Sequence, residues 1–138
     1  MAVEEEPTLG VSPEKICNLI ARARAFHAKE EVVIPEQPSS PTDNWALQVL
    51  ADHKDDPSYQ ELRYLIGGMD EEEQTNLVAL MWLGRGDYSE DEWNEALDDA
   101  RGRLSDHTAE YVIATPLVAD YLEEGLSALG YTCEGITE

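Results

Sequence analysis

Residues 77–93 read LVALMWLGRGDYSEDEW, and this stretch decides the fold. Its first seven residues, 77–83, are all apolar, and a helix that is apolar on every side is usually buried on every side. We therefore expect residues 77–83 to form a central core helix. The stretch GRGD at residues 84–87 interrupts it, and because glycine readily adopts the left-handed backbone of a helix end, we expect Gly84 to end the helix.

Helical spacing of apolar residues recurs along the rest of the chain, and helix start and stop signals separate the segments. Ser12-Pro13 and Asp56-Pro57 are typical helix starts, while Gly67-Gly68 and Gly130 are typical ends. We found no alternating strand pattern, hairpin signal or internal repeat. The sequence therefore predicts an all-α fold, a compact bundle of about six or seven helices around the central helix.

We divide the chain into four parts. Residues 1–11 are expected to be a flexible acidic tail, and residues 12–42 a basic helix followed by a proline-rich connector. Residues 43–130 form the predicted helical domain, and its first helix is expected to start at Thr42 or Asp43. Residues 131–138 are expected to be a loose tail.

The first predicted helix is basic, although the chain is acidic. Lys15, Arg22 and Lys29 recur every seven residues and so form a stripe beside the apolar face. This stripe can dock on the acidic body of its own chain or on that of a second copy. Because a long connector follows the helix, exchange of the helix between two copies stays open beside packing within one chain.

The chain has 138 residues, 30 acidic against 9 basic, and a net charge of -21. This charge repels nucleic acid and anionic membranes, so we expect neither as a direct partner. A basic protein partner or divalent cations suit it better, and the simplest interpretation is a solvated acidic surface. The acidic N-terminus and the absence of a long apolar run lead us to expect a soluble cytoplasmic protein without a signal peptide.

The two cysteines, Cys17 and Cys133, lie far apart in the sequence and form no metal-binding pair. One disulfide between them is possible, but in a reducing cytosol we expect two free thiols.

Two segments, EEEQTNLVALMWLGRGDYSEDEW and TPLVADYLEEGLSALG, carry a resemblance to a known family. Over residues 62–130 the chain resembles the small bacterial family of domain of unknown function 3775. The phrase MWLGRGD is its most specific part. The resemblance implies a small helical bacterial domain, and it implies no activity, cofactor or catalytic residue.

The break in the central stretch offers one candidate binding site. Arg85 and Asp87 can form a small polar recognition site beside Trp82 and Trp93, because arginine and tryptophan are enriched at binding hot spots. The structural alternative is that the glycines permit a chain reversal and that Arg85 binds helix carbonyls or pairs with Asp87.

A second candidate is a metal site. Glu95, Asp98 and Asp99 share one face of a predicted helix, and hard cations take oxygen ligands. The same residues also suit the solvent-facing side of an amphipathic helix.

We predict a non-enzymatic protein-interaction or regulatory module that self-associates, as a homodimer, and that can bind a basic partner. No nucleophile–base pattern and no cofactor motif is present, so we expect no catalytic residues and no cofactor. The alternatives are a metal-dependent enzyme or sensor using the helix-face carboxylates, and an acidic inhibitor that mimics DNA.

Overall fold

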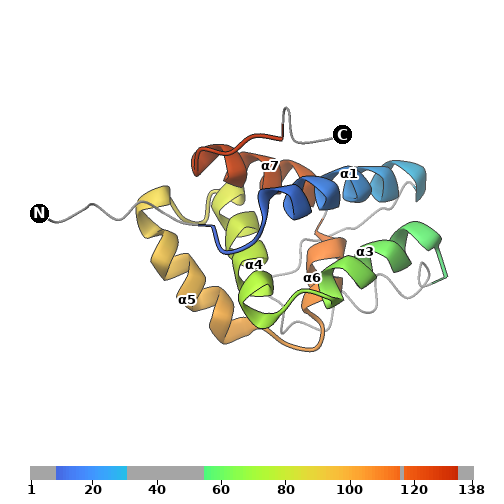
Figure 1. Ribbon diagram of the computed structural model, residues 1–138, viewed down its shortest axis with the longest axis horizontal. Coiled ribbons are helices and arrows are strands. Elements are labelled where there is room, and N and C mark those ends of the chain that lie inside the picture. Colours follow the sequence, from blue (N-terminus) through green and yellow to red (C-terminus); the bar gives the residue numbers. More distant parts are fainter. Residues whose placement is uncertain (1–8, 31–54, 116, 134–138) are drawn as a thin grey trace, which may run out of the picture.

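The computed structural model describes residues 9–30, 55–115 and 117–133, and within this part every regular element is a helix (Figure 1). This confirms the all-α prediction. The elements are α1 (Pro13–Glu30), α3 (Pro57–Gly67), α4 (Glu71–Arg85), the short 3₁₀ helix η2 (Glu90–Glu92), α5 (Trp93–Arg103), α6 (Thr108–Ala114) and α7 (Val118–Ala128). The proline-rich connector and the helix expected after Thr42 lie outside the described residues.

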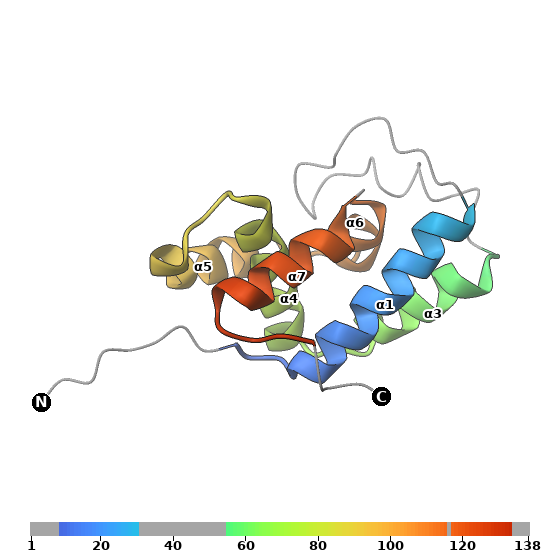
Figure 2. The ribbon, with the colours of Figure 1, turned by 90° about the horizontal axis from the view of Figure 1, so that it is seen from above.

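Helix α4 is the centre of the bundle, as its apolar sequence predicts. Every side chain from Leu77 to Leu83 is at most 7% exposed. Helix α4 packs against α7 and α5, while α1 packs against α7 and α3. Figure 2 shows α7 crossing over α4, with α1 and α3 side by side at one end and α5 at the other.

The start of α4 is fixed by a capping box. The side chain of Asp70 accepts a hydrogen bond from the backbone N–H of Glu73 (2.8 Å), and the Glu73 carboxylate accepts one from the N–H of Asp70 (3.1 Å). This arrangement satisfies two backbone donors that the first helical turn leaves without partners.

The end of α4 differs from the prediction. The helix continues through Gly84 to Arg85, and the left-handed cap is Gly86, with φ at 96°. Gly84 instead lets α7 approach, because a Cβ atom at this position would lie 1.7 Å from the carbonyl oxygen of Tyr121. Gly125 on α7 makes a similar close contact, because a Cβ there would lie 2.5 Å from the carbonyl oxygen of Leu80.

Helix α1 docks on the body of its own chain, the first of the two alternatives for the basic stripe. Its apolar face, including Ile16 and Phe26, is fully buried. The salt bridges that flank this face are Lys15–Glu73 (2.7 Å), Arg22–Glu61 (2.5 Å), Arg24–Asp120 (2.9 Å) and Arg24–Glu123 (2.7 Å).

The prediction of two free thiols is wrong. Cys17 and Cys133 form a disulfide, with their Cα atoms 5.7 Å apart. They are separated by 116 residues in the sequence, and only the packing of α1 alongside α7 brings them together. Sequence spacing alone cannot reveal such a pair.

Ordered packing extends beyond the expected limits of the fold at both ends. Leu9 and Val11 are buried, although they lie in the expected flexible tail. After α7, the N–H of Tyr131 donates to the carbonyl oxygen of Leu126 (2.8 Å), and Cys133 is held by its disulfide. None of the described helices has the length and apolar character needed to cross a membrane.

Candidate functional site

The turn after α4 is held by a pair of oppositely charged side chains. The Nε and Nη2 atoms of Arg85 both donate to the Oδ2 atom of Asp87, at 2.9 Å and 2.6 Å. The backbone N–H of Asp87 donates to the carbonyl oxygen of Trp82 (3.0 Å), which fixes the chain reversal. The structural interpretation of GRGD, a reversal with an Arg85–Asp87 pair, therefore matches this geometry.

A buried polar contact supports this turn from inside. The indole N–H of Trp82 donates to the hydroxyl oxygen of Tyr111 at 2.6 Å, and Tyr111 is fully buried. Burial acts to lower the pKa of Arg85, but the hydrogen bonds to Asp87 and the hydroxyl of Tyr111 outweigh it, so its pKa is raised. The guanidinium is therefore charged, and its two hydrogen bonds to Asp87 hold it in place.

Tyr88 covers the outer side of Trp82. The two rings stack, with centroids 6.1 Å apart and an interplanar angle of 29°. The hydroxyl of Tyr88 hydrogen-bonds to the carboxylate of Asp99 on α5, and this bond raises the pKa of Tyr88 to about 12. Tyr88 thus ties the loop after α4 to α5.

A hollow of about 310 Å³ opens at this point. We call it the arginine hollow; its lining residues are Trp82, Arg85, Asp87, Tyr88 and Arg103. Three of the four residues proposed from the sequence line it, and the fourth, Trp93, is only 2% exposed and lies outside the lining.

Sequence reasoning missed Tyr88 and Arg103. The position of Tyr88 in the sequence is explained by a hydrophobic contact at the start of the next helix. The position of Arg103 is explained by the favourable interaction of a positive charge with the end of a helix. Neither pattern shows that the two side chains meet Arg85, because that depends on how α5 packs against α4.

The proposed metal ligands Glu95, Asp98 and Asp99 are exposed side chains of α5. Asp98 pairs with Arg101 (3.2 Å), and Asp99 accepts the hydrogen bond of Tyr88. In the part of the chain that the structure describes, no three side chains of histidine, cysteine, aspartate or glutamate are grouped so as to hold a metal ion. Two of the three proposed ligands, Asp98 and Asp99, therefore already pair with Arg101 and Tyr88, and the metal site stays a prediction.

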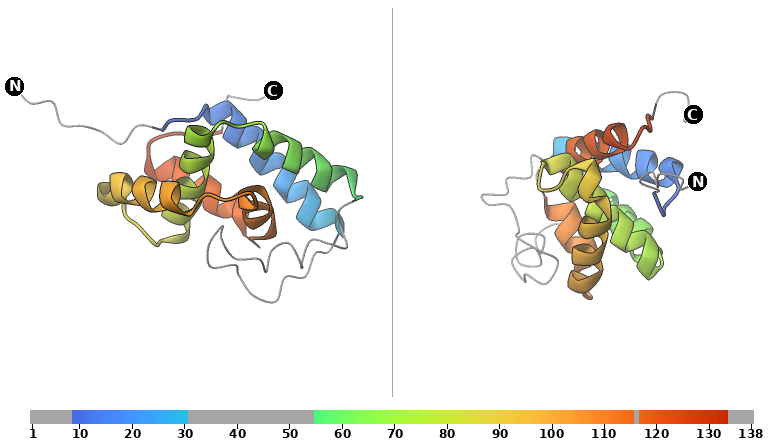
Figure 3. Two further views of the ribbon diagram at one scale, coloured as in Figure 1. Left: turned by 90° about the horizontal axis from the view of Figure 1, so that it is seen from below. Right: turned by 90° about the vertical axis from the view of Figure 1, so that its left-hand side faces the viewer.

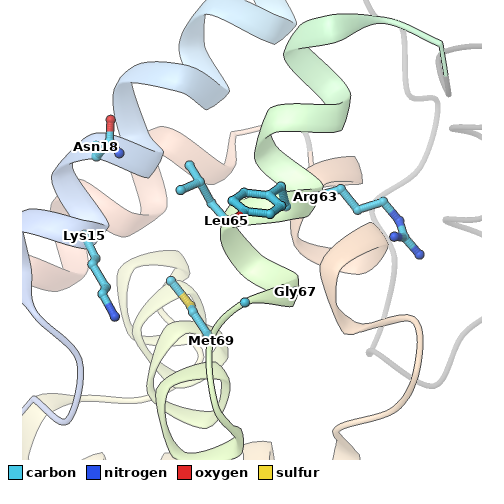
Figure 4. A pocket seen from close by; sticks show the side chains of 8 residues that line it. Lys15, Asn18, Arg63, Leu65, Gly67 and Met69 are labelled. Atoms are coloured by element: carbon cyan, nitrogen blue, oxygen red, sulfur yellow. The ribbon is translucent and has the colours of Figure 1, made fainter.

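Helices α1 and α3 lie side by side at the other end of the molecule (Figure 3). A larger hollow is lined by residues of both helices (Figure 4). We call it the α1–α3 groove. It has a volume of about 540 Å³, and its lining residues are Lys15, Asn18, Arg63, Tyr64, Leu65, Gly67, Gly68 and Met69. Tyr64 is 81% exposed, the highest value among the large apolar residues that the structure describes.

The charged side chains around the groove have partners within the chain. Lys15 pairs with Glu73, and Arg63 donates to the Oε2 atom of Glu110 at 2.6 Å. The Glu110 side chain is 3% exposed, and its other oxygen, Oε1, has no hydrogen-bond partner among the described residues. Charges near the groove are therefore largely compensated.

Comparison with known proteins gives a family and no activity. The family described as a protein of unknown function (DUF3775) matches residues 59–131, which is more than half of the chain and includes the arginine hollow. No curated protein and no solved structure matches the chain. The chain therefore belongs to the family of proteins of unknown function DUF3775.

Proposed function

We propose that the protein is a non-enzymatic interaction module that forms a homodimer through the α1–α3 groove. The observation that carries this proposal is Tyr64, a large aromatic side chain that is 81% exposed and lines the groove together with Leu65 and Met69. Tyrosine is enriched at the energetic centres of protein interfaces, because it buries a large area and loses little conformational entropy.

The charge distribution favours a second copy at this face. Two copies with a net charge of -21 each repel one another over most of their surfaces. Around the groove, in contrast, Lys15, Arg22 and Arg63 each pair with a carboxylate of the same chain. Repulsion between two copies is therefore weaker around the exposed ring of Tyr64.

A two-fold dimer requires a surface that is complementary to itself. Tyr64 is itself one of the lining residues of the groove, so the tyrosine of one copy can enter the groove of the other while the reciprocal contact forms. Figure 4 shows Leu65 and Met69 in this region, with Lys15 on the opposite helix.

Sedimentation of the full chain tests the dimer. Tyr64→Ser should convert the dimer to a monomer without loss of helical content. Leu117→Ser is the matched control, because Leu117 is the other exposed large apolar residue (51%) among the described residues and lies outside the groove. A wild-type chain that sediments as a monomer, or equal effects of the two substitutions, would contradict the proposal.

Exchange of α1 between copies is a different route to a dimer. The disulfide distinguishes such an exchanged dimer from a dimer formed through the groove. In an exchanged dimer Cys17 of one copy bonds to Cys133 of the other, so the dimer is covalent. In a groove dimer each disulfide stays within one chain. Denaturing electrophoresis without reductant should therefore show a monomer band if the groove dimer is correct, and a dimer band would support exchange.

A basic protein partner is the second candidate, and the acidic face of η2 and α5 supports it. Glu90, Asp91 and Glu95 are exposed and make no salt bridge within the described part of the chain. A lysine-rich peptide should bind this face, and binding should weaken at high salt because exposed charges are then screened. The same face is what the alternative of an acidic DNA mimic requires.

A triple substitution of Glu90, Asp91 and Glu95 by neutral residues should weaken binding of that peptide. The control removes the same charge elsewhere, from the exposed residues Glu14, Asp106 and Glu124. Equal weakening by both sets would mean that the peptide responds only to net charge, which would contradict a specific face.

A further inference from the structure

The arginine hollow holds two cationic side chains in a chain of net charge -21. Arg85 comes from the end of α4 and Arg103 from the end of α5, and the single carboxylate among the lining residues belongs to Asp87. The lining therefore carries a net positive charge, against the charge of the molecule as a whole.

Arg103 is unusual among the cationic residues. Of the lysine and arginine side chains that the structure describes, it alone has no carboxylate within salt-bridge distance in the described residues. The others are neutralised by glutamate or aspartate. A cationic side chain without a carboxylate partner is available to an anionic ligand.

Arg85 is held in a fixed position. Two of its donors bind one oxygen of Asp87, and its side chain is only 18% exposed. A guanidinium has five N–H donors in a planar fork, so the contacts to Asp87 leave donors for a further acceptor. Such a fork matches the two oxygens of a carboxylate or phosphate, and a fixed side chain loses little entropy on binding.

Aromatic side chains form the rest of the lining. The stacked rings of Trp82 and Tyr88 are positioned by hydrogen bonds to Tyr111 and Asp99. A volume of about 310 Å³ lies at the lower end of the range of small-molecule sites. The site is therefore suited to a small ligand and is distinct from the α1–α3 groove.

We propose that the arginine hollow binds a small oxyanion, a carboxylate or phosphate group, between Arg85 and Arg103. This inference is independent of the homodimer, because the two sites share no lining residue. Loss of dimerisation in the Tyr64 variant would leave it unaffected.

The test is a titration of the full chain with inorganic phosphate and, separately, with succinate, at constant ionic strength maintained with sodium chloride. Nuclear magnetic resonance signals of the Trp82 indole N–H and of the Tyr88 ring report on the hollow. We expect saturable shifts with at least one of the two anions. Saturation by phosphate alone identifies a phosphate-bearing ligand, and saturation by succinate alone a carboxylate.

Arg103→Gln should weaken the affinity by about tenfold or more, because it removes a charge-assisted hydrogen bond. Arg101→Gln is the matched control: it lies on the same helix, removes the same charge, and pairs with Glu72 and Asp98 outside the hollow. The affinity of this control should stay within about twofold of that of the wild type, since an exposed charge acts only weakly at a distance. Absence of saturation with both anions, or equal weakening by the two variants, would overturn the proposal.

Discussion

Gly84 of α4 lies directly against the backbone of Tyr121 on α7, so closely that a Cβ atom at Gly84 would be 1.7 Å from the Tyr121 carbonyl oxygen. Gly125 makes the reciprocal contact from α7, against the carbonyl oxygen of Leu80. Two helices can approach this closely only where one of them lacks a side chain. The α4–α7 contact therefore leaves no room for a side chain at Gly84 or Gly125.

Gly84→Ala should destabilise the protein by about 3 kcal/mol or more, because the helices must separate and the core on both sides must shift. Urea unfolding followed by circular dichroism measures this change. Gly102→Ala is the control: a Cβ at this α5 position has no atom within 4 Å, and alanine should add about 0.5–1 kcal/mol of stability. A Gly84→Ala variant as stable as the wild type would mean that the α4–α7 contact is looser than described.

Reduction of the Cys17–Cys133 disulfide should lower the free energy of unfolding by about 2–5 kcal/mol, because the bond closes a long loop in the unfolded chain. Unfolding curves with and without dithiothreitol test this prediction. A variant with serine at both positions should resemble the reduced wild type and show no response to dithiothreitol. A thiol assay of the denatured, unreduced protein that detects two free thiols would contradict the bond itself.

Arg85→Ala should cost about 1–2 kcal/mol of stability, because the side chain is only 18% exposed and loses its contacts with Asp87 and Tyr111. Arg101→Ala is the comparison, since its salt bridges are exposed and should contribute about 0–1 kcal/mol. Thermal unfolding of both variants gives the difference. Equal effects would show that Arg85 does not support the turn.

The pKa of Tyr88, raised to about 12 by its hydrogen bond to Asp99, should fall toward 10.0 in Asp99→Asn. Because the folded-state value is the higher one, the stabilisation is complete below pH 10 and is lost as the pH rises toward 12. The ring signals of Tyr88 in a pH titration measure the value. Asp98→Asn is the control, because Asp98 pairs with Arg101, and it should leave the pKa of Tyr88 unchanged.

Local sequence signals predicted the elements well, because each signal acts within one or two turns of a helix. Asp56-Pro57 begins α3, and the apolar run 77–83 is buried. The end of α4 was misplaced by two residues. Both Gly84 and Gly86 are suitable caps, and contact with α7 decides between them, since Gly84 is needed where the helices cross.

The candidate sites were only partly predictable. The tripeptide around Arg85 and Asp87 is local in sequence, so their pairing could be anticipated, whereas Arg103 joins them through the packing of α5. No sequence signal indicated the α1–α3 groove. In the sequence Tyr64 is one tyrosine in an ordinary helical pattern, and the groove forms only because α1 packs beside α3.

The sequence by itself determined an acidic all-α protein with α4 at its centre, since apolar periodicity and caps depend on neighbours along the chain. Only the tertiary structure decided that α1 docks on its own chain, that Cys17 bonds to Cys133, and that Glu110 is buried against Arg63. These contacts join residues 47 to 116 positions apart. They form only when whole helices pack together, and no local pattern encodes which side chains then meet.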